Sequence, residues 1–168
     1  MNDFLSGIRI MLVACVLILG LLVFGLRAGA VQSSDRPTPD LVRVHVPPGW
    51  FMGTWISNDT KRPVSEFVCN RAMKEPLMKA LHCVYRYQMT NKRQVLHRFS
   101  GCYSPRKIFG TDRWSKHAYG MAVDLNYFPE TGKTKVEMPV VKCFEKEGFI
   151  WGGRWKNKPD SMHFELRR

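Results

Sequence analysis

Residues 115–126 read SKHAYGMAVDLN, and residues 160–166 read DSMHFEL. The alternation in the first stretch predicts a short strand over 121–126 that carries Asp124 on one face. The second stretch predicts a strand that pairs beside it and carries His163. The fold therefore centres on two strands that bring polar, chemically reactive side chains together.

The rest of the chain supplies short elements around this pair. Apolar periodicity and the positions of Pro and Gly predict strands over 41–46, 93–100 and 149–151, and helices over 66–73, from Pro76 onward and over 139–147. In the helix that starts at Pro76, the apolar stripe is Leu77, Leu81 and Val84 or Tyr85. The predicted fold class is α+β, with a small antiparallel sheet flanked by helices.

The composition is that of a folded, strongly basic protein. Of the 168 residues, 45% are apolar and 12% are aromatic, which is enough for one packed domain and excludes wholesale disorder. Lys and Arg total 26 against 14 Asp and Glu, and the formal net charge is +12. Such a surface favours anionic partners, namely nucleic acid, anionic lipid or an anionic polymer.

The N-terminal segment predicts export. From Ile10 to Leu26 the chain has 17 consecutive residues without a charge or a strongly polar group, which is the short end of a membrane span. Two interpretations stand: a signal anchor that is retained, or a signal peptide cleaved after Ala30 in the small-x-small sequence Ala28-Gly29-Ala30. Retention is favoured because the run is long for a signal-peptide core. A buried core helix is disfavoured because the run has no polar face.

The predicted organisation has three parts. Residues 1–30 are the signal anchor or signal peptide, residues 31–40 are a Ser- and Pro-rich linker, and residues 41–168 are the folded domain. Under either leading interpretation, residues 31–168 leave the cytoplasm. They then lie in the periplasm or another extracytoplasmic space.

Five cysteines are present, and Cys15 lies inside the apolar run. The other four, Cys69, Cys83, Cys102 and Cys143, can form two disulfides in an oxidising compartment, with three possible pairings. Buried free thiols are the alternative. None has the Cys-x-x-Cys spacing of a zinc site.

Three side chains in the two deciding stretches offer the ligands of a catalytic zinc ion, which takes three nitrogen or oxygen atoms and keeps one position open for water. They are His117, Asp124 and His163. Asp160 is expected in the turn that enters the second strand, where its carboxylate can act as a general base without binding the metal. Spacing alone is weak evidence, because His-x6-Asp is frequent by chance.

Neighbouring residues have expected supporting roles. Ser115 is expected to position the loop that carries His117 through a side-chain hydrogen bond. Glu165 lies on the same face of its strand as His163 and is a candidate hydrogen-bond partner for it. Trp155 either lines a substrate groove or belongs to the core, and the same alternative holds for Trp151.

The two stretches resemble the signature of the zinc peptidases that include D-alanyl-D-alanine carboxypeptidases, D-Ala-D-Ala dipeptidases and the L-alanyl-D-glutamate endopeptidases of bacteriophage endolysins. That signature is Ser-x-His-x-x-Gly-x-Ala-x-Asp, then Gly-Gly-x-Trp, then Asp-x-x-His-Phe, and every position is matched within residues 99–166. The resemblance implies that His117, Asp124 and His163 bind Zn²⁺. It also implies that Asp160 is the catalytic base.

The same resemblance implies an arginine upstream of the first motif. Arg106 is the best match, and Lys107 and Arg113 are the neighbouring basic residues. Its role would be to hold a carboxylate or carbonyl oxygen of the substrate as charge develops.

The function that the resemblance implies is zinc-dependent hydrolysis of peptidoglycan stem peptides. Because the dipeptidases carry Glu where this chain has Asp160, the resemblance favours the endolysin-like L-alanyl-D-glutamate endopeptidases. The alternatives are a D-alanyl-D-alanine carboxypeptidase and a non-catalytic, membrane-anchored basic protein that binds the cell envelope.

The expected partners are peptidoglycan and, through the N-terminal helix, the membrane. The protein is expected to be a monomer. Nucleic acid fits the charge, but predicted export and the lack of a recognised nucleic-acid motif count against it.

Overall fold

The computed structural model describes residues 36–53 and 55–167. The predicted segment 1–30, with its apolar run and Cys15, lies outside the described residues, as do residues 31–35 of the predicted linker. In the part of the chain that is described, no helix is both long and apolar enough to cross a membrane.

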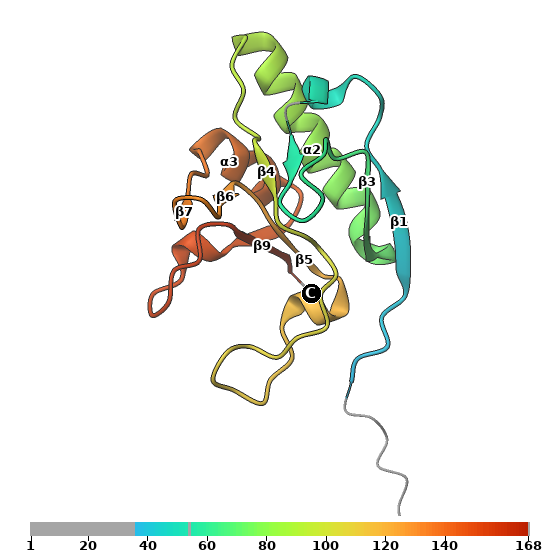
Figure 1. Ribbon diagram of the computed structural model, residues 1–168, viewed down its shortest axis with the longest axis vertical. Helices are drawn as coiled ribbons and strands as arrows, with labels where there is room; N and C mark the ends of the chain where they lie inside the picture. Colours follow the sequence, from blue (N-terminus) through green and yellow to red (C-terminus); the bar gives the residue numbers. More distant parts are fainter. Residues whose placement is uncertain (1–35, 54, 168) are drawn as a thin grey trace, which may run out of the picture. The chain divides into compact units, whose positions relative to one another are not determined.

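The described residues form an α+β fold with two α-helices and several small sheets, as the sequence predicts (Figure 1). The helices are α2 (Arg71–Asn91) and α3 (Met138–Lys146), and the short 3-10 turns are η1 (Trp50–Gly53), η2 (Lys116–Tyr119) and η3 (Gly152–Arg154). The strands are β1 (Leu41–His45), β2 (Ile56–Ser57), β3 (Glu66–Asn70), β4 (Arg98–Phe99), β5 (Ala122–Asp124), β6 (Tyr127–Phe128), β7 (Lys133–Thr134), β8 (Phe149–Trp151) and β9 (His163–Leu166).

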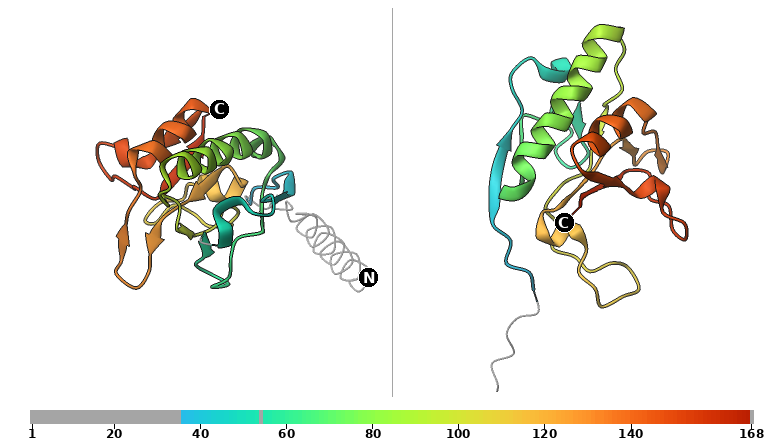
Figure 2. Two further views of the ribbon diagram at one scale, coloured as in Figure 1. Left: turned by 90° about the horizontal axis from the view of Figure 1, so that it is seen from above. Right: turned by 180° about the vertical axis from the view of Figure 1, so that it is seen from behind.

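The sheet that carries the two deciding stretches is three-stranded and antiparallel, in the order β5–β9–β8. Its register places Asp124 directly opposite His163. Directly opposed residues on one face of an antiparallel pair have neighbouring side chains, so this register alone brings two predicted ligands together. The helices α2 and α3 lie beside each other, and α3 also packs on β8 (Figure 2).

The other strands do not join this sheet. β1 pairs antiparallel with β3, β6 pairs antiparallel with β7, and β2 pairs parallel with β4. The prediction of one small antiparallel sheet is therefore correct for the part that carries the site. The remaining strands form separate two-stranded sheets.

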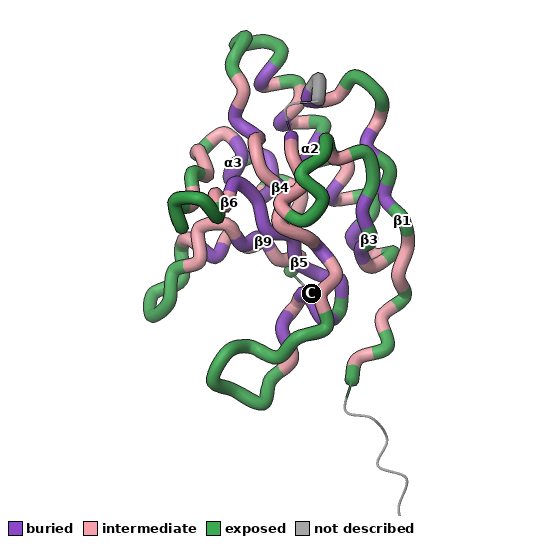
Figure 3. The backbone as a smooth tube through the Cα atoms, in the orientation of Figure 1, coloured by how far each residue is buried: buried purple, intermediate pink, exposed green. Residues whose placement is uncertain are grey.

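The core lies between the helices and the strands, and β5 and β9 run through it as largely buried segments (Figure 3). Leu77, Leu81 and Val84 of α2 are buried as the sequence predicts. In α3 the apolar residues Val140, Val141, Cys143 and Phe144 are buried. Phe144 contacts Phe164 of β9 with a ring-centroid distance of 4.6 Å, so α3 packs directly behind the strand that carries His163.

The helix predicted over 66–73 is wrong, because residues 66–70 form β3 and pair with β1. Asn70 begins the helix instead: its side-chain oxygen accepts a hydrogen bond from the Ala72 N–H at 3.0 Å. One continuous helix then runs to Asn91, with Pro76 inside it. The helix therefore starts at Arg71, not at Pro76.

The strand predicted over 93–100 is reduced to β4, although Val95 and Phe99 are buried as expected. The physical reason is the buried side chain of Gln88 in α2. Its Oε1 atom accepts hydrogen bonds from the Val95 N–H at 2.9 Å and the Leu96 N–H at 2.8 Å. These donors are thereby satisfied without a neighbouring strand.

The described residues contain two disulfides, Cys69–Cys102 and Cys83–Cys143. This is one of the three pairings that the sequence leaves open. Cys83–Cys143 joins α2 to α3, and Cys69–Cys102 joins β3 to the segment after β4. A disulfide closing loops of this length stabilises a domain by about 2–4 kcal/mol.

Replacing Gln88 by Leu keeps the volume but removes the acceptor of two buried N–H groups. We expect the free energy of unfolding to fall by about 2–4 kcal/mol, because each unsatisfied buried donor costs about 1–3 kcal/mol. Urea unfolding followed by circular dichroism measures the change. Met89→Ala on the exposed side of the same helix is the control, with an expected loss under about 0.5 kcal/mol. Equal losses in the two variants would refute this account of the 93–97 segment.

Candidate metal centre

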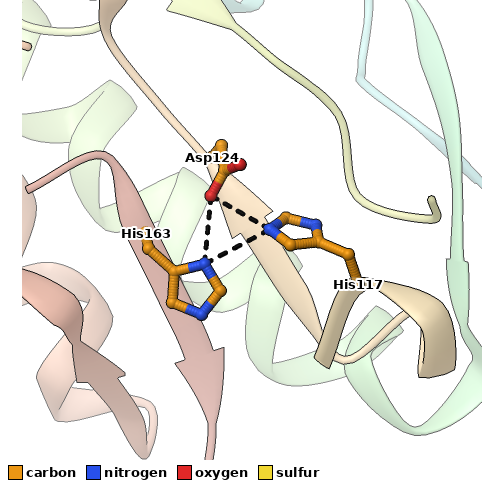
Figure 4. Close-up of side chains that lie close together, drawn as sticks. All are labelled: His117, Asp124 and His163. Carbon is orange, nitrogen blue, oxygen red and sulfur yellow. Dashed lines mark hydrogen bonds and ion pairs between the residues drawn. The ribbon is translucent and has the colours of Figure 1, made fainter. Parts of the chain in front are cut away.

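The side chains of His117, Asp124 and His163 converge at the edge of the β5–β9 pair (Figure 4). The Oδ1 atom of Asp124 lies 3.0 Å from Nε2 of His117 and 3.1 Å from Nδ1 of His163. The two imidazole nitrogens are 3.2 Å apart. All three residues are buried, with 1%, 3% and 6% of their surface exposed, respectively.

The position of His117 follows from how η2 begins and ends. The Ser115 hydroxyl accepts a hydrogen bond from the His117 N–H at 3.3 Å, as the sequence predicts. Gly120 ends the turn with a φ of +62°, and its N–H donates to the His117 carbonyl at 3.0 Å. A Cβ at Gly120 would lie 2.7 Å from the Asn70 nitrogen, so no larger residue fits where η2 meets β3.

Each imidazole is also held at the nitrogen that faces away from the centre. His117 Nδ1 lies 2.8 Å from the Cys102 carbonyl oxygen, and His163 Nε2 lies 3.2 Å from Glu165 Oε2. Because both partners are acceptors, each of these nitrogens carries a proton and donates it. In the state in which both rings are neutral, this arrangement leaves the inward nitrogens with lone pairs directed at the centre.

These residues fit a zinc ion. Ligands at about 2.0–2.2 Å in a tetrahedral arrangement are separated from one another by about 3.3–3.5 Å, close to the observed separations of the three inward atoms. Two imidazole nitrogens and a carboxylate oxygen are ligand types that catalytic zinc takes, with a fourth position left for water. Among the described residues, this is the one cluster of three or more His, Cys, Asp or Glu side chains with ligand atoms this close together.

The electrostatics of the centre are strongly coupled. Burial raises the pKa of the Asp124 carboxyl, but hydrogen bonds from His117 and His163 outweigh this effect and hold the pKa well below its usual range. Burial lowers the pKa of His163, but hydrogen bonds to Asp124 and Glu165 raise it to about 9. His163 must therefore lose a proton before its Nδ1 atom can bind a metal.

Asp160 and Arg106 lie at the rim. Asp160 stands at the turn before β9, where its carbonyl accepts the His163 N–H at 3.2 Å. Burial and the nearby negative charge of Asp124 raise the pKa of the Asp160 carboxyl, which makes it a better proton acceptor. The Arg106 guanidinium is half-exposed, and its Nη2 atom is 3.7 Å from Asp124 Oδ2. The structure thus brings the five site residues expected from the sequence into one region: His117, Asp124, His163, Asp160 and Arg106.

A groove of about 650 Å³ opens over the centre. Its lining consists of residues 107–109 and 113–116, from the loop before η2, together with Arg106, His117, Trp155, Asp160, His163 and Glu165. The ring of Trp155 lies 5.2 Å from that of His163, so Trp155 is a groove residue. Trp151 instead packs near Phe164 and donates its Nε1–H to the Ser161 carbonyl at 2.8 Å.

Close backbone approach at Gly152 holds the turn that carries Asp160. A Cβ at Gly152 would lie 2.5 Å from the carbonyl oxygen of Asp160 and 3.2 Å from Cβ of His163. Only glycine therefore permits the Asp160 N–H to donate to the Gly152 carbonyl at 3.0 Å. Gly152, the first glycine of the Gly-Gly pair, thus sets the position of the residue predicted to be the base.

Sequence reasoning missed the apolar side of the groove. Ile108, Phe109 and Trp114 line it, and Phe109 at the loop tip is 97% exposed. The loop is folded back on itself by the hydrogen bond from the Ile108 N–H to the Arg113 carbonyl at 2.8 Å. The available signal was two large apolar residues beside a Gly-Thr-Asp turn, where a solvent-exposed turn is normally polar.

Glu165→Ala removes the acceptor that orients His163. We expect the dissociation constant for zinc to rise by about 10–100-fold, the typical cost of losing an outer partner of a metal-binding histidine. Competition with a chromophoric chelator measures it. Glu145→Ala removes a carboxylate that binds Arg154 in an exposed ion pair, and it should leave zinc affinity unchanged. Unchanged affinity in Glu165→Ala would show that Glu165 does not position His163.

Comparison with known proteins finds a matching family and a distant structural match. Residues 109–166 match the family model described as D-alanyl-D-alanine carboxypeptidase. The crystal structure of the L-Ala D-Glu endopeptidase ChiX of Serratia marcescens matches with 17% sequence identity and a TM-score of 0.34, over 59% of this chain and 80% of that one. A structural likeness this distant carries no argument about this chain. The family match, however, spans both motifs and the converging side chains, and residues 109–166 thus resemble the D-alanyl-D-alanine carboxypeptidase family of peptidases.

Proposed function

We propose that this protein is a zinc-dependent peptidase that hydrolyses peptidoglycan stem peptides, with the endolysin-like cleavage between L-Ala and D-Glu as its reaction. One observation carries the proposal: three buried ligand atoms converge beneath a groove that also holds Asp160 and Arg106. This constellation lies mostly within the segment that matches the peptidase family.

The side chains divide the work of peptide hydrolysis among them. A zinc ion held by His117, Asp124 and His163 would polarise the scissile carbonyl and lower the pKa of a water molecule. Asp160 accepts a proton from the attacking water and passes it to the leaving nitrogen. Its raised pKa suits it to the first of these steps, because it binds the proton more readily than an ordinary carboxylate does.

Arg106 is suited to the negative charge that develops on the substrate. Its guanidinium is held near Asp124 but remains half-exposed, so N–H groups are left to face the groove. A charge-assisted hydrogen bond to the carbonyl oxygen strengthens as that oxygen becomes negative, which lowers the barrier. The same guanidinium can bind a substrate carboxylate in the ground state.

The second candidate is a D-alanyl-D-alanine carboxypeptidase. The description of the matching family favours it, as does a rim arginine that can hold a terminal carboxylate. The two candidates share the same centre and the same proton transfers. They differ in which stem bond reaches the centre.

We also propose that the domain acts outside the cytoplasm, held by or released from the N-terminal apolar segment. Two disulfides support this proposal, because such bonds persist mainly in oxidising compartments. The basic surface suits an anionic cell envelope. Cell fractionation that finds the full-length protein only in the cytosol would contradict it.

Digestion of purified peptidoglycan by the zinc-loaded protein tests the reaction. We expect a new D-Glu N-terminus within the stem peptide, identified by mass spectrometry. Asp160→Asn keeps the shape but cannot take the proton, so turnover should fall by about 10²-fold or more while zinc content is unchanged. Loss of terminal D-Ala alone would move the assignment to the carboxypeptidase. Near-normal turnover in Asp160→Asn would show that another group is the base.

Arg106→Ala should reduce kcat/KM by an amount equal to about 2–4 kcal/mol of transition-state stabilisation, with zinc still bound. Arg113→Ala is the matched control, because Arg113 lines the same groove but has no contact with Asp124 in the described structure. Steady-state kinetics on a defined stem peptide measures kcat/KM for the Arg106→Ala and Arg113→Ala variants. A large loss in Arg113→Ala only would assign the role to Arg113.

A further inference from the structure

A five-residue segment, residues 100–104, holds two of the three candidate ligands through backbone atoms. The Ser100 N–H donates to the Asp124 carbonyl at 2.9 Å, and the Asp124 N–H donates to the Gly101 carbonyl at 3.1 Å. The Cys102 carbonyl accepts from Nδ1 of His117 at 2.8 Å, and the Ser104 N–H donates to the His117 carbonyl at 3.0 Å. The position of this segment therefore determines how Asp124 and His117 meet.

The 100–104 segment has no regular secondary structure of its own, and the Cys69–Cys102 disulfide ties it to β3. Both cysteines are buried, with 0% and 2% of their surface exposed. One further backbone hydrogen bond joins the segment to β3, from the Tyr103 N–H to the Val68 carbonyl at 3.2 Å. The disulfide is thus the covalent part of a short connection between β3 and the metal centre.

From β3 the connection returns to His117, so the contacts form a closed ring. The Asn70 N–H donates to the Gly120 carbonyl at 2.9 Å, and the Asn70 side-chain amide donates to the Tyr119 carbonyl at 3.0 Å. The Gly120 N–H donates to the His117 carbonyl. The imidazole is therefore held from both sides by groups that meet at Cys69 and Asn70.

We propose that the Cys69–Cys102 disulfide is a positioning element of the metal centre, and that its reduction releases His117 and weakens metal binding. The proposal rests on the proposed function only in requiring that the centre binds a metal. It makes the centre redox-sensitive: it reaches full affinity only in an oxidising compartment. It also assigns different roles to the two disulfides.

The reaction that would reduce the Cys69–Cys102 disulfide is thiol–disulfide exchange with a dithiol. One thiolate of the dithiol attacks a sulfur of the disulfide, and the S–S bond breaks to leave a mixed disulfide and one cysteine thiolate. The second dithiol sulfur then displaces the other cysteine. The dithiol loses two electrons and two protons and becomes a cyclic disulfide, and Cys69 and Cys102 end as two thiols.

The second disulfide provides a matched control. Cys83–Cys143 joins α2 to α3, and in the described part of the chain neither cysteine has a hydrogen bond to His117, Asp124 or His163. Loss of either disulfide should lower the free energy of unfolding by about 2–4 kcal/mol. Only loss of Cys69–Cys102 should alter the centre itself.

The first experiment compares the full-length Cys69→Ser/Cys102→Ser and Cys83→Ser/Cys143→Ser proteins in detergent. Zinc affinity is measured by competition with a chromophoric chelator, without a reductant that would itself bind zinc. We expect the dissociation constant to rise about 10–100-fold in the first variant, on the scale of a lost partner of a metal-binding histidine, and to change less than about 3-fold in the second. Equal effects in the two variants, or no effect in the first, would overturn the proposal.

The second experiment needs neither metal nor activity, and it observes His117 directly. In the metal-free Cys83→Ser/Cys143→Ser protein, Cys69–Cys102 is the disulfide left within the described residues, and dithiothreitol reduces it. Nitrogen-15 NMR then follows the Nδ1–H of His117. In reduced protein whose amide spectrum remains that of the folded state, we expect loss of the hydrogen-bonded signal. A signal that persists in this reduced, folded protein would refute the proposal. If the oxidised wild type binds no zinc, the proposed function fails, while this measurement still tests the positioning of His117.

Discussion

A buried carboxylate between two imidazoles is the constraint on which the rest of this structure depends. Asp124 is almost fully enclosed, and an ionised carboxylate in such a place is very costly unless it is paired and hydrogen-bonded. Its two histidine partners must come from other parts of the chain. The register of β5 with β9 provides one, and the η2 turn provides the other.

The contacts around the centre hold the two histidines beside the Asp124 carboxylate. The Cys102 carbonyl and the Glu165 carboxylate accept hydrogen bonds from the outward N–H groups of the two rings. The rings therefore cannot rotate away from Asp124 without losing a hydrogen bond. Arg106 approaches the remaining oxygen of Asp124 from the solvent side. Each of these contacts favours the same arrangement of the three side chains, which is what a preorganised site requires.

The side-chain part of the site could be predicted from the sequence, and its backbone part could not. His117, Asp124, His163 and Asp160 carry chemistry in their side chains, and the resemblance of the two motifs to a peptidase signature implies their roles; their spacing alone does not. Cys102 acts on His117 through a carbonyl group that every residue possesses, and nothing in the sequence marks that role. The disulfide pairing was likewise open, because three pairings satisfy the same four cysteines.

In the fold, likewise, some elements could be predicted from the local sequence and others could not. Strands β5 and β9 and helix α3 were predicted because their apolar positions follow a regular period. Residues 66–70 were assigned to a helix because nothing local shows that β1 pairs with them. The local pattern of residues 93–97 predicts a strand. It does not show that the side chain of Gln88, from α2, accepts hydrogen bonds from the Val95 and Leu96 N–H groups. In both cases a long-range partner decided the outcome against local propensity.

The central place of β9 has a consequence for the order of folding. This strand follows β5 and β8 in the chain yet lies between them, and His163 reaches an Asp124 that is 39 residues away. Contacts between such distant residues form late, because the intervening loop must first be closed. In a chain that emerges N-terminus first, β5 and β8 lack their common neighbour until residues 163–166 arrive. Until β9 docks, His163 is missing from its place beside Asp124, and the three-residue centre is incomplete.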